Sequence, residues 1–232
     1  MVCDWSSHGH DPSGPVEDQG SFYAMVEKKT IGGKPYWTLY RGWKLAPGED
    51  PFARPTVGGF RDVFQDDYYA DPVQWAIAEG IAYGTTANTF SPATRCSREQ
   101  VVTFLWRAMG QPKPQSTHCP FTDAAPGAYY YDAVLWAYET GITQGTTATT
   151  FGVQESCSRA QVVTFLHRAM GAPQPTGAAS PFQDVKPGAY YYNAVLWAQE
   201  NHIAAGTSAT TFGSTASCDR AAIVTFLYRA LA

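Results

Sequence analysis

The sequence predicts a mainly α-helical fold. Three helix–loop–helix repeats close into a pseudo-threefold bundle, and an N-terminal β-hairpin segment precedes them. One pattern recurs every 61 residues without insertion, as Trp75, Trp136 and Trp197 show. Each copy is too short to bury a stable core alone, so the copies must share one. The end copies are as apolar as the middle one and lack the polar caps of an open solenoid, which favours a closed arrangement.

The domain layout follows from this period. The chain divides into a non-repeating segment and three repeats, at residues 1–59, 60–110, 121–171 and 182–232. The repeats are separated by segments rich in Pro and small or polar residues, the composition of exposed linkers, at 111–119 and 172–180. In residues 22–45, two β-rich runs flank Gly32-Gly33, which predicts the hairpin.

The first helix of each repeat is predicted from its ends. In the second repeat Asp132 is expected to cap a helix that starts at the next residue, and Asp71 does the same in the first. Gly141 stands where a left-handed C-terminal cap is expected. In the third repeat His202 takes that place, so we expect that helix to end differently.

The second helix of each repeat has a clearer start. Ser158 and Gln161 form a capping box, and the same pair occurs 61 residues earlier. In the third repeat Asp219 can cap, but Ala222 replaces the glutamine. A cysteine precedes every cap. Three equivalent cysteines cannot all pair with one another, so we expect them to be small buried hydrophobic residues, at positions 96, 157 and 218.

Composition excludes several classes of function. The chain has 232 residues, of which 44% are hydrophobic and 16% charged, and its net charge is −4. It is therefore globular, and it lacks the concentrated positive charge that nucleic-acid binding requires. No apolar run reaches the roughly 20 residues of a membrane span. The first ten residues have neither the basic flank nor the apolar stretch of a signal peptide.

The repeated motifs resemble a known family. In order they are F-x-D, A-V-x-W-A, G-I-x-x-G, F, and S-R-x-Q before an apolar helix. This order resembles the S-layer homology (SLH) repeat, three times over residues 60–232. The resemblance implies a pseudo-trimer with a central three-helix bundle. It also implies binding of secondary cell-wall polymer, often pyruvylated, in grooves between lobes, on the surface of Gram-positive cells.

The resemblance also implies where the ligand binds. The family's Thr-Arg signature falls on Ser97-Arg98, Ser158-Arg159 and Asp219-Arg220. A guanidinium fork suits the carboxylate of a pyruvate ketal, and the N-terminal end of a helix favours an anion. The candidate ligand-binding residues are four sets of three equivalents: Arg98, Arg159, Arg220, Asp62, Asp123, Asp184, Trp75, Trp136, Trp197, Gly84, Gly145 and Gly206.

Each set has a structural alternative. The arginines can pair with the repeated aspartates, the tryptophans can be packing residues, and the glycines can simply form a turn. We expect packing for most tyrosines in the runs at 68–69, 129–131 and 190–192. The third repeat departs most from the family pattern, so its groove, or the one that it shares with a neighbour, is expected to be the weakest.

The predicted function is non-catalytic anchoring to an anionic cell-wall polysaccharide, with no cofactor. We find no H-E-x-x-H, G-x-S-x-G or phosphate-loop motif. Cys3, His8, His10 and Asp11 match no zinc spacing, and a Cys3–Cys119 disulfide stays open as an alternative to free thiols. The rival hypothesis is a protein–protein assembly module with the same fold. An upstream effector domain or protein partner is compatible with both hypotheses.

Overall fold

A computed structural model describes residues 10–11, 14–15, 22–31, 34–44, 54–177 and 179–232. The chain divides into two compact units, Met1–Pro55 and Thr56–Ala232. In the first unit, β3 (Phe22–Ile31) pairs antiparallel with β4 (Lys34–Lys44), as predicted for a hairpin. A shorter ladder, β1 (His10–Asp11) with β2 (Gly14–Pro15), was not predicted. The expected turn glycines, and Cys3 and His8 of the N-terminal cluster, lie outside the described residues.

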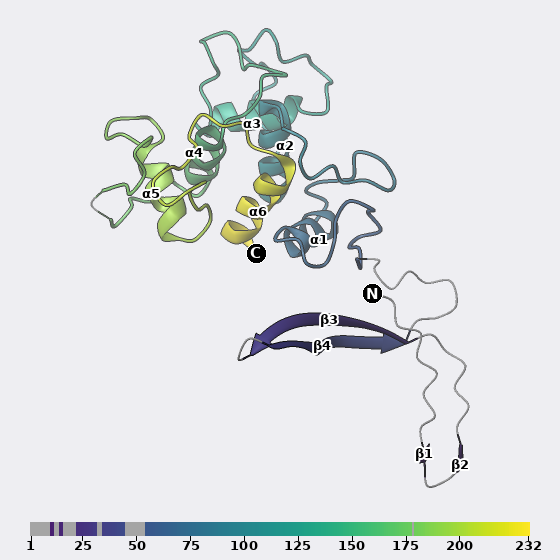
Figure 1. Cartoon of the computed structure of the whole chain (residues 1–232). Coiled ribbons are helices and arrows are strands. Elements are labelled where there is room, and N and C mark those ends of the chain that lie inside the picture. The colour runs from purple at the N-terminus through teal and green to yellow at the C-terminus, as the bar shows by residue number, and fades with distance from the viewer. Residues whose placement is uncertain (1–9, 12–13, 16–21, 32–33, 45–53, 178) are drawn as a thin grey trace. The chain divides into compact units, whose positions relative to one another are not determined.

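The second unit contains two helices in each repeat, as predicted (Figure 1). Their bounds are α1 (Ala70–Ala78), α2 (Arg98–Ala108), α3 (Tyr131–Glu139), α4 (Arg159–Ala169), α5 (Tyr192–Glu200) and α6 (Arg220–Leu231). Turns and bends connect the two helices of each repeat. The fold is therefore mainly α-helical.

The helices pair across repeat boundaries rather than within a repeat. Among the described elements, α2 packs on α3, α4 packs on α5, and α6 packs on α1 (Figure 1). Each of the three lobes thus combines the second helix of one repeat with the first helix of the next. Because the last helix packs on the first, the ring of lobes is closed, and no repeat has a complete set of contacts on its own.

The second helices form the centre of the unit. Helices α2, α4 and α6 contact one another, and the residues just before them are joined by backbone hydrogen bonds. The Cys96 N–H donates to the Cys218 carbonyl at 3.1 Å, the Cys157 N–H to that of Cys96 at 3.0 Å, and the Cys218 N–H to that of Cys157 at 2.9 Å. This cycle makes the pseudo-threefold arrangement explicit.

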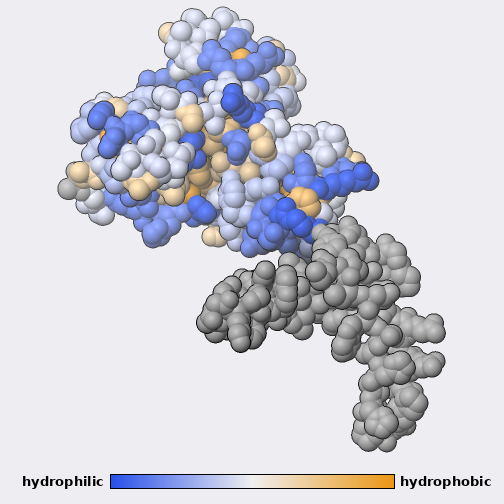
Figure 2. Space-filling model, in the orientation of Figure 1, coloured by the Kyte–Doolittle hydropathy of each residue, from blue (hydrophilic) through white to orange (hydrophobic). Residues whose placement is uncertain are grey.

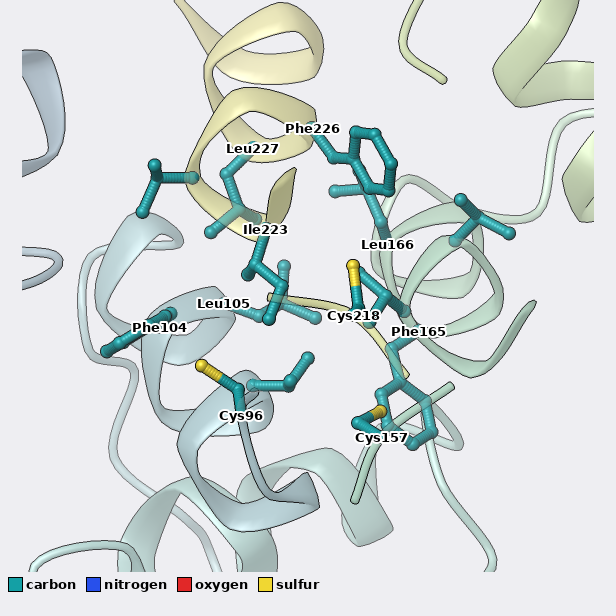
Figure 3. Packing of buried hydrophobic residues seen from close by; sticks show 14 of the residues in the cluster. Cys96, Phe104, Leu105, Cys157, Phe165, Leu166, Cys218, Ile223, Phe226 and Leu227 are labelled. Carbon is teal, nitrogen blue, oxygen red and sulfur yellow. The ribbon is translucent and has the colours of Figure 1, made fainter. Parts of the chain in front are cut away.

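The shared core lies around this cycle. Figure 3 shows the three cysteines among the equivalent Phe and Leu residues of the central helices. Cys96, Cys157 and Cys218 are at most 1% exposed, which confirms them as small buried hydrophobic residues. Burial raises the pKa of Cys96 and of Cys157 to about 12. These thiols are consequently protonated at neutral pH.

The helix ends agree with the sequence in part. The capping box at α4 is present: the Ser158 N–H donates to Gln161, and the Gln161 N–H donates back to the serine hydroxyl. The predicted aspartate caps of the first helices are wrong. Helix α3 starts at Tyr131, before Asp132, and neither α1 nor α3 has a side-chain cap. The α5 end was also predicted wrongly, because His202 adopts the left-handed conformation that Gly141 has in the second repeat.

Candidate functional site

Each arginine at the start of a central helix binds the loop of the next repeat around the ring. In all three cases Nε donates to a phenylalanine carbonyl: Arg98 to Phe151 (2.9 Å), Arg159 to Phe212 (3.1 Å) and Arg220 to Phe90 (2.9 Å). We call these contacts the first, second and third junctions, in the order of their arginines. The family-signature arginines therefore hold neighbouring repeats together.

Two aromatic rings enclose each guanidinium group. At the second junction, Cζ of Arg159 lies 4.9 Å from the Phe212 ring centroid and 5.2 Å from that of Phe226. The other junctions repeat this arrangement. Distances below about 6 Å permit favourable cation–π contacts. Arg98 and Arg220 are only 3% and 6% exposed, and burial lowers their pKa from the ordinary value.

These positions correct the expectation that all three arginines are available to a ligand. Arg98 and Arg220 are buried, whereas Arg159 is half-buried and its Nη2 donates to the Ala205 carbonyl at 2.7 Å in an exposed position. The alternative of arginine–aspartate pairs also fails for the described residues, since the arginines bind carbonyl oxygens instead. Of the three junctions, the second is the most open to a ligand.

The helix N-termini are already occupied by the protein. The backbone N–H of Arg98 donates to the Glu155 carbonyl at 2.9 Å, and Arg159 and Arg220 make equivalent bonds to the loop that follows around the ring. In α2, the Glu99 carboxylate also accepts from the Gln154 N–H at 2.9 Å. The N–H groups at the first helical position thus have protein acceptors, contrary to the expectation that they would attract an anion.

The repeated aspartates organise the loops that the arginines bind. Oδ1 of Asp123 accepts from the Phe151 N–H at 2.8 Å, and Oδ2 accepts from the N–H groups of the next two residues at 2.8 and 2.9 Å. Burial acts to raise the pKa of Asp123, but these hydrogen bonds outweigh it, so the pKa lies below its ordinary value. Asp62 and Asp184 hold their own loops in the same way. Each aspartate therefore positions a junction carbonyl.

The repeated glycines lie in a turn with no room for a side chain. A Cβ on Gly206 would lie 2.5 Å from the Phe182 ring and 2.6 Å from the Thr211 carbonyl oxygen. Gly84 and Gly145 face equivalent atoms, all closer than real Cβ contacts. Tight packing of the turn is sufficient reason for glycine at these positions.

The tryptophans lie in the core. Trp136 and Trp197 are each 7% exposed, and half-buried Trp75 packs edge-to-face on Tyr228 of α6, with ring centroids 5.6 Å apart. The Trp197 ring lies 5.2 Å from that of His167 on α4. These rings pack where two helices of a lobe meet. The predicted contact of Trp136 and Trp197 with a sugar face is inconsistent with their burial.

Three of the exposed aromatic residues are tyrosines from the runs that were expected to be mostly packing residues. Tyr68, Tyr129 and Tyr190 are equivalent and about 60% exposed (62%, 59% and 61%). Each ring packs edge-to-face against the tyrosine that follows it, at 5.0 to 5.1 Å. Electrostatic interactions join Tyr68 to Arg159 and Tyr190 to Arg98. These tyrosines precede the first helix of each repeat and lie outside its apolar face. That position is the signal that could have identified them as exposed.

A junction therefore combines parts of all three repeats. At the second junction, repeat 2 supplies Arg159, repeat 3 supplies the Ala205 and Phe212 carbonyls, and repeat 1 supplies Tyr68. The face drawn in Figure 2 is mostly hydrophilic, and its apolar residues gather towards the middle, between the lobes. An exposed aromatic ring beside a cation is an arrangement that suits an anionic saccharide.

In the described part of the chain we find neither a candidate membrane-spanning helix nor a candidate metal site. None of the helices there combines the length and apolar character that a membrane span requires. No group of three or more His, Cys, Asp or Glu side chains there could hold a metal ion.

Comparison with curated proteins gives relatives of which two are named as surface proteins. The chain is 29% identical over 128 residues to "Surface-layer 125 kDa protein" of Lysinibacillus sphaericus, which covers 54% of this chain and 11% of the relative. It is 31% identical over 116 residues to "Cell surface protein" of Thermoanaerobacter kivui, covering 48% and 15%. It is also 31% identical over 110 residues to "Endoglucanase" of Bacillus sp. (strain KSM-635), covering 47% and 11%. The chain thus spans between a tenth and a sixth of the length of these relatives.

Comparison with protein families gives one match, which covers two of the three repeats. The model of the S-layer homology domain matches residues 59–102 and 120–163, which are most of the first and second repeats. The third repeat lies outside the matched segments but has the same two helices and the same junction. The resemblance to the S-layer homology domain is thus confirmed for the first and second repeats, over residues 59–102 and 120–163.

Proposed function

We propose that this protein is a non-catalytic anchoring module at the cell surface, which binds an anionic, pyruvylated secondary cell-wall polysaccharide at the junctions between its repeats. The family assignment and the surface-layer and cell-surface names of two relatives support the location. The endoglucanase match covers only 11% of that relative, which suits a module that is shared between surface proteins of different activity.

The observation that carries the proposal is the composition of the second junction. Arg159 is half-buried, so its guanidinium group is held in place by the protein while one side meets solvent. The exposed ring of Tyr68 lies within its electrostatic reach. A fixed guanidinium group binds a carboxylate with good geometry, and a neighbouring aromatic ring can pack on the apolar face of a sugar. We therefore assign the main role to this junction, although it includes the repeat that the sequence ranked weakest.

Sedimentation with purified cell-wall sacculi tests the function. We expect the chain to be retained by sacculi that bear the polymer, and retention to fall by about tenfold in Arg159→Ala and in Tyr68→Ala. Lys113→Ala is the matched control, because it removes one positive charge from the exposed first linker. Circular dichroism of each variant separates lost binding from lost folding, since Arg159 also binds two carbonyls.

The rival assembly module makes the opposite prediction for the wall. Mild acid removes pyruvate ketals from the polymer, and anchoring through a carboxylate then predicts loss of retention. Retention that is indifferent to this treatment, together with wild-type retention of both variants, would reject the proposal and favour a polypeptide partner.

A further inference from the structure

The third repeat carries a surface hollow that borders the second junction. Its volume is about 650 Å³, within the usual range of small-molecule sites. It lies between the end of α5 and the last turn of α6, and its lining residues are Gln199, Asn201, His202, Ala204, Ala205 and Arg229. The Ala205 carbonyl is the oxygen that Arg159 Nη2 binds at 2.7 Å, so the hollow and the junction share a wall.

The hollow exists because one large side chain is missing. The positions equivalent to Ala205 hold Tyr83 in the first repeat and a glutamine in the second. The Tyr83 ring lies over the guanidinium group of Arg107, with Cζ 5.3 Å from the ring centroid. In the third repeat Ala205 offers only a methyl group in place of that ring, and Arg229 is exposed whereas Arg107 is half-buried. The truncation at residue 205 uncovers an arginine that the first repeat covers.

The lining has the charge of a site for an anion. It contains Arg229 and no acidic residue, and Asn201 stands where the first repeat has Glu79. One nitrogen of Arg229, Nη1, donates to the Ile203 carbonyl at 3.3 Å, and its other nitrogens have no hydrogen-bond partner among the described residues. A guanidinium group that is fixed at one nitrogen retains the donors that pair with a carboxylate.

The rim of the hollow holds a histidine in an unfavourable conformation. His202 has φ +56, where the equivalent residues are Gly80 and Gly141. A non-glycine residue there costs on the order of 1 kcal/mol. The substitution places an additional ring with hydrogen-bonding nitrogens at this hollow alone among the three repeats.

The geometry points to a carboxylate site in this hollow. We propose that the hollow binds the carboxylate of an acidic saccharide unit through Arg229, with the amide side chains of Gln199 and Asn201 at its edge. The exposed Tyr68 ring lies close enough to Arg159 and Arg229 to interact electrostatically with both, so the ring is near the hollow as well as the second junction. This inference rests on the proposed wall-binding function but names a different arginine from the family signature.

The test uses a small probe rather than the wall. The 15N-labelled full chain is titrated with methyl β-D-glucuronide, and with methyl β-D-glucoside as the neutral control. We expect saturable shifts of the Gln199 and Asn201 side-chain amide signals with the glucuronide only. Arg229→Ala should raise the apparent Kd by about tenfold or more, which is the loss of one charge-assisted pair. Arg107→Ala, the same change at the covered arginine, should leave the Kd unchanged.

A second variant protects the test against misfolding. Ala205→Tyr introduces the residue that the first repeat tolerates at this position, and it should close the hollow while Arg229 stays in place. Absence of saturable shifts in the wild type, or a wild-type Kd in both Arg229→Ala and Ala205→Tyr, would overturn the proposal. If sacculi retain the chain but the glucuronide causes no shifts, the carboxylate site in the hollow is rejected and the anchoring function stands. If the glucuronide binds but sacculi do not retain the chain, the anchoring function is rejected and the carboxylate site stands.

Discussion

The aspartate that organises each junction loop gives the sharpest stability prediction. In Asp123→Asn, one oxygen can still accept from the Phe151 N–H, but the amide NH2 replaces the oxygen that accepts from Gly152 and Val153. Each of these two bonds contributes about 1 kcal/mol in a half-exposed site, and in the variant the side-chain NH2 group would face two backbone N–H groups. We expect the free energy of unfolding to fall by about 2–3 kcal/mol at pH 7.

The pH dependence distinguishes charge from packing. The folded pKa of Asp123 lies below its ordinary value of 3.8, so its stabilising contribution is complete above that value and is lost as the pH falls through the folded pKa. The difference between wild type and Asp123→Asn should therefore shrink from pH 7 towards pH 2.

Urea unfolding followed by circular dichroism at several pH values measures this difference. Asp132→Asn is the matched control, because Asp132 is exposed in the first turn of α3 and should change the stability by less than about 1 kcal/mol. A gap that stays constant with pH, or an Asp123→Asn variant as stable as the wild type, would show that the loop does not depend on the carboxylate.

Two further changes test the turn and the core. Gly84→Ala should lower the free energy of unfolding by about 2 kcal/mol or more, because its Cβ would meet the Phe60 ring and a turn carbonyl. Gly59→Ala is the control: it has open space around it and should cost about 1 kcal/mol from its positive φ alone. Thermal unfolding of the two variants measures the difference. The core thiols should react with Ellman's reagent at pH 8 only as fast as the unit unfolds, since burial raises the pKa of Cys96 and Cys157 to about 12. For the same reason stability should be full below their ordinary value of 9.0 and fall as the pH rises above it. Rapid labelling of all the thiols in the folded chain would contradict the buried cycle.

The period and the helices could be predicted from the sequence because they are local or recurrent. Capping boxes and apolar stripes are patterns within one turn or two, and a 61-residue repeat is visible without any structure. The burial of all three cysteines could also be predicted, because three equivalent cysteines cannot all form disulfides with one another. What these features have in common is that each depends on residues close together in the chain or on symmetry.

The site was harder to predict because it forms where helices and loops of different repeats pack together. Sequence spacing places Arg159 in a helix start but does not reveal that the loop of the next repeat covers it. The same ambiguity affected the aromatic residues: Trp136 lies in an apolar stripe and is buried, while Tyr129 lies outside any stripe and is exposed. The capping aspartates failed for a simpler reason, since Asp132 lies within the helix that it was expected to cap.

Closure of the ring predicts how the protein responds to loss of a repeat. A chain that ends at residue 171 lacks α5 and α6, so α4 and α1 each lose the helix that they pack on. The Cys96 N–H also loses its acceptor on Cys218. An open solenoid would keep most of the stability of its remaining repeats, because each contacts only its neighbours. Here we expect the truncated chain to lose its cooperative unfolding transition.

A circular permutant supplies the matched control for that truncation. It keeps residues 1–55 at its start, continues with 116–232, and joins residue 232 to residues 56–115 through a copy of the linker 172–180. Every lobe contact is retained, and the two bonds that are cut join residues 55 and 56 and, in the linker between α2 and α3, residues 115 and 116. Because closure depends on α6 packing on α1 and not on chain order, the permutant should unfold cooperatively within a few degrees of the parent. A truncated chain that unfolds cooperatively like the parent, beside a permutant that does not fold, would mean that the repeats are stabilised in chain order and that the closed ring contributes little.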